Sequence, residues 1–421
     1  MMLASVLTLG MAPGLAFFEA GLLKGKNAVS VLIQVFSGIM IMSTMWTLFG
    51  FSMTFGDSKG GIIGSPLQYP LLMNLPEDYC FEQAPNIPAI IFALFQMMFA
   101  SITPLLQTGS FAGRLQFRAF VFYIIFWEIF VYYPLTHWIW GNGWLSPNSN
   151  VLLGYGVYDF AGGIVMHLSS GVGSFICALA VGNRYGYTKG RGTPSNLGFA
   201  ALGASFLWLG WFGLNGGNAL SAGSVSAIAV INTQIAGSVS GCIWLIISWK
   251  RNKPSLVETL NGAIAGIAGI TALSGYVDTP FAFLVGIVSG LLAYLGVYLM
   301  KEKYSIDDAL DVSVIHGLTG LVGSLLVGFI ATSKVNPNGV DGWIGGQPMQ
   351  ILYQMLGVVV AILWSGVWTI IILFAMKKTI GIRVSQVAEE YGLDNIEHGE
   401  QIDLFLHLRK KSRAISDGDF P

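Results

Sequence analysis

Charged residues are scarce in this chain, because Asp, Glu, Lys and Arg together make up only 10% of its 421 residues. A soluble protein would carry about a quarter charged residues. Cysteine is also scarce, with Cys80, Cys177 and Cys242 as the three examples. Their spacing fits neither a metal site nor a disulfide framework. We expect Cys177 and Cys242, which lie in apolar runs, to be packing residues.

Several functional signatures are missing. The sequence has no P-loop, no dinucleotide-binding fingerprint and no catalytic-triad spacing. It also has no run of arginines of the kind found in voltage sensors. We therefore expect neither an enzyme nor an ATP-driven pump nor a voltage-gated channel, and we expect no cofactor and no nucleic-acid partner.

Apolar residues are abundant instead, at 54% of the chain. Apolar stretches about twenty residues long recur from end to end, which is typical of an all-α polytopic membrane protein. We predict a membrane domain over 1–376 and a polar tail over 377–421. The eleven predicted membrane-spanning helices are 2–23, 28–55, 87–110, 115–140, 160–181, 195–215, 224–249, 256–275, 280–300, 309–332 and 349–376.

The basic residues predict the orientation of these helices. Nearly all of them fall in alternate connections, and only Lys59 and Lys334 fall in the others. The first set is Lys24, Lys26, Arg114, Arg118, Arg184, Lys189, Arg191, Lys250, Arg251, Lys253, Lys301, Lys303, Lys377 and Lys378. Because basic loops stay in the cytoplasm, we predict the N-terminus outside and the C-terminus inside a multi-pass protein of the plasma membrane.

Two stretches share one design, an acid followed by a histidine after eight residues. They contain Asp159 and His167 in the fifth predicted helix, and Asp308 and His316 in the tenth. Eight helical residues rise about 12 Å, which brings each histidine towards the middle of a core about 30 Å thick. With the predicted orientation, the fifth and tenth helices run in opposite directions. This pattern indicates a 5+5 inverted repeat, helices 1–5 over about 2–181 and helices 6–10 over about 195–332, with helix 11 extra and a functional site at the repeat interface.

The histidines admit two interpretations. They are either unrelated core residues or the lining of a shared pore, and ionisable residues inside a membrane usually mark a pathway. A neutral imidazole donates from one nitrogen and accepts at the other, so a pair can bind a small polar solute in a dry pore. A metal site is not expected, because no third ligand lies near either histidine. Small residues around His167 and His316 predict close helix approach.

The acidic residues of the predicted helices can also be interpreted in structural terms. Asp159 lies about 80° around the helix from His167, so we expect it to hold helix-start backbone groups, and Asp308 and Asp311 admit the same interpretation. Glu19 and Glu128 are further intramembrane acids, and we interpret Glu128 as a residue of the lipid interface or of a subunit contact.

Aromatic residues cluster at the predicted outer helix ends. Phe95 and Phe99 are one helical turn apart, and Trp138, Trp140 and Trp144 surround the end of the fourth helix. They form either an interfacial belt or a cation–π platform, and composition alone favours neither. Glycines beside two polar residues, Asn215 and Asn218, indicate that the backbone in 210–218 approaches its neighbours closely and that the sixth helix is broken there.

At this point the chain resembles a known family, the ammonium transporters (Amt/Mep/Rh), and the Amt/Mep branch in particular. The similarity covers nearly the whole chain. The matching segments are Pro13–Asn27, Asp159–Arg184, Gly210–Gly217, Asn261–Gly266, Asp311–Gly317 and Gly381–Glu400.

The resemblance implies a homotrimer with one hydrophobic pore per subunit that recruits NH4⁺ outside and conducts NH3. Phe99, Trp140 and Asn218 match the recruitment site. Phe99 also matches one of two stacked phenylalanines that form a gate at the pore mouth, and Leu214 stands where the second would be. The resemblance further implies that His167, His316, Trp211 and Thr271 line the pore or its vestibule, and that Asp159 is a structural acid below the recruitment site.

Three positions depart from the family pattern. Leu214 removes a ring from the gate, Asn218 replaces a frequent serine, and Glu19 replaces a frequent aromatic residue. The alternatives to a transporter are an ammonium sensor that signals through its cytoplasmic tail, and a gas channel for NH3 or CO2. Methylammonium is the expected analogue of the substrate. The resemblance also suggests a PII-type regulator or a kinase at the tail.

Overall fold

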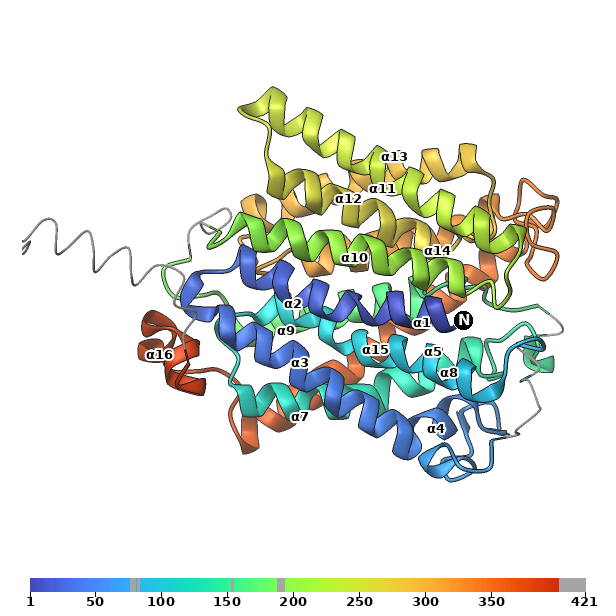
Figure 1. Ribbon diagram of the computed structural model, residues 1–421, viewed down its shortest axis with the longest axis horizontal. Helices are drawn as coiled ribbons and strands as arrows, with labels where there is room; N and C mark the ends of the chain where they lie inside the picture. Colours follow the sequence, from blue (N-terminus) through green and yellow to red (C-terminus); the bar gives the residue numbers. More distant parts are fainter. Residues whose placement is uncertain (76–80, 82–83, 153–154, 188–193, 401–421) are drawn as a thin grey trace, which may run out of the picture.

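Long helices lie side by side in one bundle in the computed structural model of this chain (Figure 1). The structure describes all residues except 76–80, 82–83, 153–154, 188–193 and 401–421. Cys80, Lys189, Arg191 and the last part of the predicted tail therefore lie outside the described residues.

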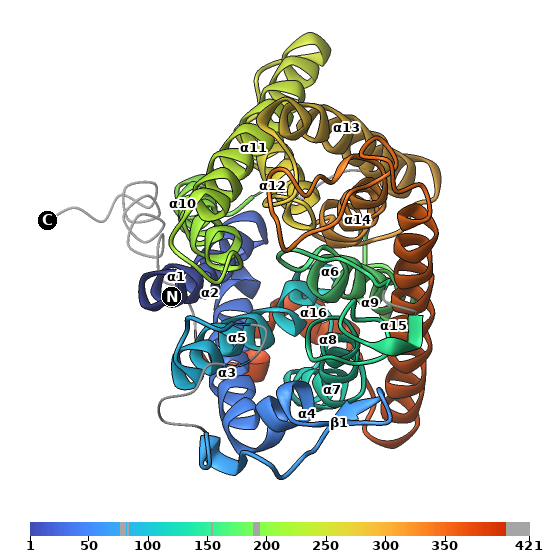
Figure 2. The ribbon, with the colours of Figure 1, turned by 90° about the vertical axis from the view of Figure 1, so that its right-hand side faces the viewer.

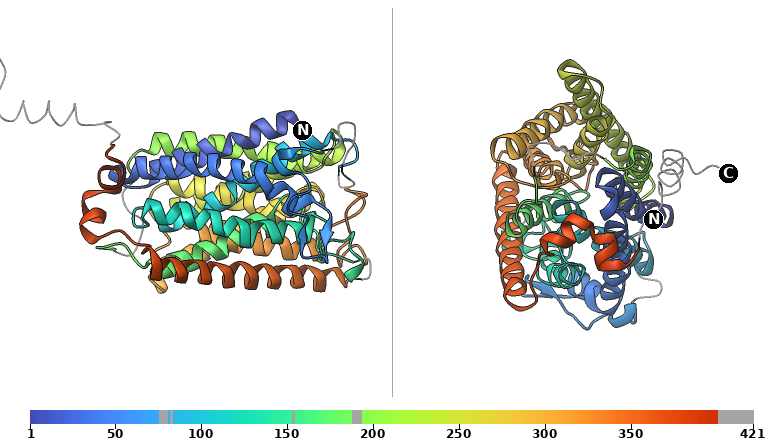
Figure 3. Two further views of the ribbon diagram at one scale, coloured as in Figure 1. Left: turned by 90° about the horizontal axis from the view of Figure 1, so that it is seen from below. Right: turned by 90° about the vertical axis from the view of Figure 1, so that its left-hand side faces the viewer.

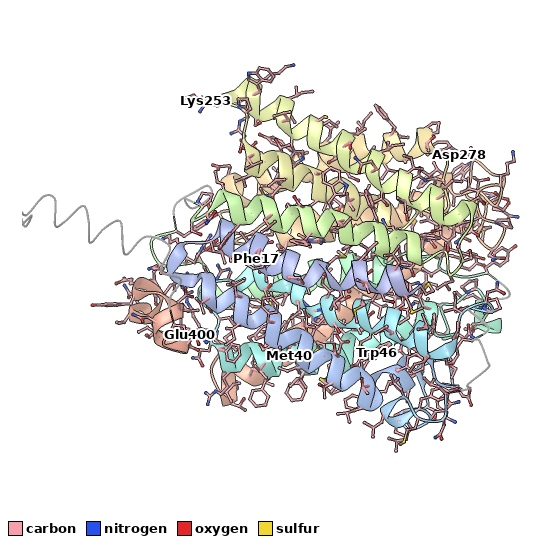
Figure 4. All side chains as sticks on the ribbon, in the orientation of Figure 1. Phe17, Met40, Trp46, Lys253, Asp278 and Glu400 are labelled. Carbon is pink, nitrogen blue, oxygen red and sulfur yellow. The ribbon has the colours of Figure 1, made fainter. Side chains whose placement is uncertain are left out.

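Ten helical segments of the described chain are long and apolar enough to cross a membrane. They are Met2–Leu22, Gly25–Phe55, Ala89–Phe111, Phe117–Trp140, Gly163–Val181, Leu197–Gly217, Ser224–Arg251, Thr279–Lys303, Ser313–Ile330 and Gln350–Thr379. The eighth predicted helix appears as a shorter apolar helix, Leu256–Thr271. At about 1.5 Å per residue its 16 residues extend about 24 Å, and Figure 4 places the flanking residues Lys253 and Asp278 at opposite ends of the bundle.

Most of these segments combine α-helix with short 3-10 or π turns, which carry η labels. In chain order they are α1 (Met2–Leu9), α2 (Met11–Leu22), η1 (Gly25–Asn27), α3 (Ala28–Met45), η2 (Trp46–Gly50), α4 (Phe51–Phe55), α5 (Ala89–Ile102), η4 (Pro104–Gln107), α6 (Thr108–Phe111), α7 (Phe117–Trp127), η5 (Glu128–Tyr132), α8 (Tyr133–Trp140), η7 (Gly163–Leu168), α9 (Ser169–Val181), α10 (Leu197–Gly217), α11 (Ser224–Arg251), α12 (Leu256–Thr271), α13 (Thr279–Tyr298), η8 (Leu299–Lys303), η9 (Ser313–Leu318), α14 (Thr319–Ile330) and α15 (Gln350–Thr379).

The remaining described elements lie in connections and in the tail. A two-stranded antiparallel hairpin pairs β1 (Ser58–Lys59) with β2 (Ile63–Gly64). The short helical elements are η3 (Pro70–Leu72), η6 (Asn150–Leu152), α16 (Gln386–Tyr391) and η10 (Asp394–His398). Figure 1 places the chain start towards the end of the bundle opposite α16.

Glycines allow the two histidine-bearing segments to cross in close contact. A Cβ at Gly171 would lie 2.1 Å from the Cα of Gly317, and one at Gly320 would lie 2.8 Å from the carbonyl oxygen of Gly163. Real side chains cannot occupy such space. The close approach predicted from the small residues around both histidines is therefore present at the centre of the molecule.

Glycines also allow α2 and α10 to pack closely against each other. A Cβ at Gly203 would lie 2.2 Å from the backbone nitrogen of Phe18, and one at Gly21 would lie 2.4 Å from that of Ala200. The predicted break in this helix is wrong, since α10 continues unbroken through Gly217. Its glycines serve close packing instead.

Two further packing predictions are wrong. Cys177 is buried as expected, but Cys242 is exposed on α11. Glu128 is fully buried and so cannot be a residue of the lipid interface or a subunit contact. The apolar character of the surrounding run did not reveal which face of each helix points inwards.

The tail begins after α15, which runs along one side of the bundle (Figure 2). The segment that holds α16 then crosses one end of the bundle (Figure 3). Asp394 accepts hydrogen bonds from the backbone N–H groups of Val29 and Ser30, at 3.1 and 2.8 Å, and so caps the start of α3. Arg383 forms an ion pair with Glu389 at 2.9 Å. The described part of the tail thus packs on its own chain.

Candidate functional site

Each histidine lies in a π-helical turn that follows an acid. His167 belongs to η7 and His316 to η9, and each turn contains 6 residues. Wide π turns leave backbone groups unpaired at their start, and these groups need partners. A preceding carboxylate supplies them.

Asp159 supplies four such partners. One carboxylate oxygen accepts from the N–H groups of Gly162 and Gly163, at 2.9 and 2.7 Å. The other accepts from Ile164 and Val165, at 2.8 and 3.1 Å. Gly162 has a positive φ of 110°, which glycine adopts without the strain of a side chain. The carboxylate therefore fixes the backbone from which His167 projects.

Asp308 holds the second turn with fewer contacts. Its carboxylate accepts from the backbone N–H of Ser313 at 2.7 Å and from the hydroxyl group of the same residue. Asp311, three residues later, has a positive φ of 65° and pairs with Lys301 at 2.7 Å.

A neighbouring carboxylate, Asp307, ties together three connections at the bundle end that carries α16. It forms ion pairs with Arg114 at 3.2 Å and with Arg184 at 2.6 Å. Burial raises the pKa of Asp307, but the hydrogen bonds from Arg184 and the charges of both arginines outweigh it, so its pKa lies below the ordinary value.

The two imidazole rings meet directly. Their Nδ1 atoms are 3.2 Å apart and their ring centroids 5.1 Å apart. A hydrogen bond between two Nδ1 atoms requires a proton on one and a lone pair on the other. The Nε2 atom of His167 has no hydrogen-bond partner among the described residues, so it is available to a solute.

Trp211 lies against both rings. Its ring is 5.7 Å from His167 and 6.2 Å from His316, and it is nearly parallel to the latter at 11°. Its indole Nε1 donates to the hydroxyl of Thr271 at 3.2 Å. Four of the predicted site residues, His167, His316, Trp211 and Thr271, therefore form one connected group.

A second group gathers three of the other predicted residues. The rings of Phe99 and Trp140 are 5.7 Å apart and nearly perpendicular, at 84°. The indole of Trp140 donates to the backbone oxygen of Asp159 at 2.8 Å. The acid that holds η7 thus also orients this tryptophan.

Asn218 and Leu214 lie at the end of α10. The Asn218 amide donates to the carbonyl of Leu214 at 2.9 Å, within its own helix, and the Leu214 side chain is fully buried. Phe95 lies close by, because a Cβ on Gly217 would be 2.6 Å from its ring. Phe95 is also 5.0 Å from Phe99, so a second phenylalanine ring packs beside Phe99 near the end of α10.

A small cavity adjoins His316. Its volume of about 20 Å³ holds one water-sized molecule. Its lining is apolar apart from three residues, Glu19, Trp211 and His316, and its other members are Leu15, Phe18, Leu106, Leu207, Ile264, Leu310, Val312 and Ile315. The sequence marked Glu19 as an intramembrane acid, but no periodicity could place it beside a histidine almost 300 residues away.

The described residues contain no cluster of three or more histidine, cysteine or acidic side chains that could hold a metal ion. The side chains of the site supply imidazole nitrogens, aromatic faces and the carboxyl groups of Glu19, Asp159 and Asp308.

Comparison with known proteins gives consistent matches over the full length. A family model described as the Ammonium Transporter Family matches residues 1–402. Ammonium transporter 1 of Dictyostelium discoideum is 50% identical, over 100% of this chain and 90% of that protein. The ammonium transporter of Aquifex aeolicus is 38% identical, over 95% and 92%.

Two solved structures share the fold. A structure described as a sensor Amt protein has a TM-score of 0.84 and 30% identity, and covers 94% of this chain and 96% of its own. Mep2 of Saccharomyces cerevisiae has a TM-score of 0.82 and 31% identity, with coverage of 91% and 89%.

Proposed function

Because the chain belongs to the ammonium transporter family, we propose that it recruits NH4⁺ outside the plasma membrane and conducts it inwards as NH3. The proposal includes eleven passes with the N-terminus outside, and three identical subunits with one pore each. Opposite placement of the chain start and α16 (Figure 1) supports an odd number of passes.

Recruitment takes place at Phe99, Trp140 and Asn218. A cation over an aromatic face gains about 0.5–2 kcal/mol, and the bond from Trp140 to the backbone of Asp159 holds one face in place. The amide oxygen of Asn218 is available to accept a hydrogen bond from the cation, since among the described residues only the amide nitrogen forms a hydrogen bond, with Leu214.

The gate below this site consists of Phe99 and Leu214. Both side chains are fully buried, so a solute must displace them. Phe95, packed against Phe99, supports the ring from the side.

The bare ion cannot cross the interior, because desolvating an isolated charge costs tens of kcal/mol. Loss of a proton leaves a neutral solute that His167 and His316 can hydrogen-bond as it passes, with Trp211 and Thr271 lining the passage and Asp159 holding the backbone above. The contact between the two imidazoles beside a water-sized cavity is the observation that carries this proposal.

Uptake of labelled methylammonium by cells that lack their own ammonium transporters tests the proposal. We expect uptake with the wild-type chain and its loss with His167→Ala. His398→Ala is the matched control and should keep uptake, because this ring lies in the tail element η10 and packs on Phe117 at the start of α7. Undiminished uptake by His167→Ala would contradict the pore assignment.

A sensor is the second candidate, favoured by the structural match to a sensor Amt protein and by the tail that caps α3 through Asp394. A PII-type regulator or a kinase would act on this tail. Proteoliposomes separate the two functions, since a sensor would bind ammonium without flux or current. A gas channel would show flux without current that Trp140→Leu leaves unchanged.

A further inference from the structure

Glu19 is a buried acid that the proposed function does not use. It lies on α2 with only 2% of its surface exposed, and it lines the same small cavity as His316. It is the only carboxyl group among the described residues that line this cavity.

The hydrogen bonds of Glu19 suit both of its protonation states. The hydroxyl of Thr108 lies 2.7 Å from one carboxyl oxygen of Glu19 and 2.6 Å from the carbonyl oxygen of Leu105. This hydroxyl has one hydrogen and can also accept. It donates to Glu19 when that group is a carboxylate, and it donates to Leu105 and accepts from Glu19 when that group is an acid. One fixed geometry thus serves a group that gains and loses a proton.

Among the described residues that line the cavity or interact with Glu19, none is a lysine or an arginine. The charged or titratable groups nearby are His316 on η9 and Asp308 just before it, and Asp308 adds negative charge. Helix α6 contributes the Thr108 hydroxyl, while α10 and α12 contribute Leu207, Trp211 and Ile264. The carboxylate therefore has no fixed counter-ion among the described residues, and a proton or an ammonium ion can neutralise it.

A second cavity shares a lining residue with the first. Leu310 lines both cavities, and the second, also about 20 Å³, includes Asn261 and Asp311 in its lining. Leu310 therefore borders both the cavity of His316 and Glu19 and a second cavity whose lining is partly polar.

We propose that Glu19 is the proton-exchange residue at the inner end of the pore, where it returns to ammonia the proton that ammonium lost at the outer end. This rests on the proposed function. The histidine pair passes the proton inwards: His167 gains it at Nε2 and releases one from Nδ1 to His316, which releases one from Nε2 to the Glu19 carboxylate. The Glu19 O–H bond then breaks as an N–H bond forms on ammonia, ammonium leaves past Leu310, and the carboxylate is restored.

Glu19→Gln separates this role from a structural one, because glutamine keeps the shape and cannot exchange the proton. Reconstituted protein is studied with two readouts after an ammonium jump, the current on solid-supported membranes and the luminal pH from a trapped dye. The wild-type chain should give a current with little luminal alkalinisation, since each ammonia arrives with its proton. Glu19→Gln should lower the current at least tenfold while ammonia entry alkalinises the lumen.

Three variants serve as controls. Glu19→Asp keeps a carboxyl group and should retain at least a third of the current. Thr108→Val removes the hydroxyl that donates to the carboxylate and accepts from the acid, so its current should fall between those of Glu19→Asp and Glu19→Gln. Glu128→Gln alters another fully buried acid, which does not line the cavity, and should leave both readouts unchanged.

An unchanged current in Glu19→Gln overturns the inference. Loss of both current and ammonia entry in Glu19→Gln and also in Glu19→Asp overturns it as well, because the residue would then be structural. Wild-type flux without current overturns the inference and leaves the proposed function intact. Wild-type protein with neither flux nor current overturns the proposed function itself.

Discussion

The two histidine-bearing segments share a local design and differ in their surroundings. Asp159 binds four backbone N–H groups before His167, whereas Asp308 binds one backbone N–H and a hydroxyl before His316. His167 is fully buried, while His316 is 7% exposed and borders a cavity. The comparison teaches that a repeated sequence pattern can supply a rigid half and a more open half around one pair of rings.

The largest expected effect concerns the two acids. Asp159→Ala leaves four buried N–H groups unsatisfied, at about 1–3 kcal/mol each, so we expect a loss of at least about 4 kcal/mol and little folded protein. Asp308→Ala leaves one backbone N–H group unsatisfied and should lower the free energy of unfolding by about 1–3 kcal/mol. The yield of folded protein in detergent measures the effect of Asp159→Ala, and thermal unfolding of the purified protein measures that of Asp308→Ala. Equal yields and equal melting temperatures for the two variants would contradict the asymmetry.

The crossing of the two segments gives the next effect. Gly171→Ala places a methyl group 2.1 Å from the Cα of Gly317, and since backbone cannot move aside locally we expect a loss of about 3 kcal/mol. Gly366→Ala is the control, because its nearest neighbours would be 3.7 Å away. A melting temperature of Gly171→Ala equal to that of the control would show that the crossing is looser than described.

A smaller effect is expected at Thr271, which supports the tryptophan shared by both halves. Thr271→Val removes the acceptor of the Trp211 indole and leaves a buried N–H unpaired, at about 1–3 kcal/mol. Thr271→Ser keeps the hydroxyl and should restore stability. Thermal unfolding followed by tryptophan fluorescence measures the difference, and an equal loss in both variants would assign it to packing alone.

The smallest effect concerns the outer aromatic pair, Phe99 and Trp140. Trp140→Leu removes one cation–π contact of about 1–2 kcal/mol, and the half-saturation concentration for methylammonium should rise about tenfold. Trp144→Leu, whose ring packs on Trp138 instead, should leave that concentration unchanged. A larger shift in the control would place recruitment elsewhere.

The sequence predicted what depends on composition and spacing. Long apolar runs predicted the helices, because a membrane core demands about twenty apolar residues per crossing. The equal step from acid to histidine singled out His167 and His316, and the glycines around them predicted close approach. These features depend on residues that are close together in the chain, so they can be predicted from the sequence.

Contacts between distant segments could not be predicted in the same way. The bond between the two Nδ1 atoms and the placement of Glu19 beside His316 depend on how separate helices rotate about their axes. The same uncertainty explains the wrong expectations for Glu128 and Cys242, since an almost uniformly apolar helix does not reveal its inward face.

The bond between the two imidazoles has a consequence for turnover. A proton that moves across it leaves each ring in the opposite tautomer, so the pair points the wrong way for a second transfer. Before the next passage both rings must rotate or exchange their hydrogens. In the proposed proton transfer, the pair therefore has to return to its starting tautomers after every ion.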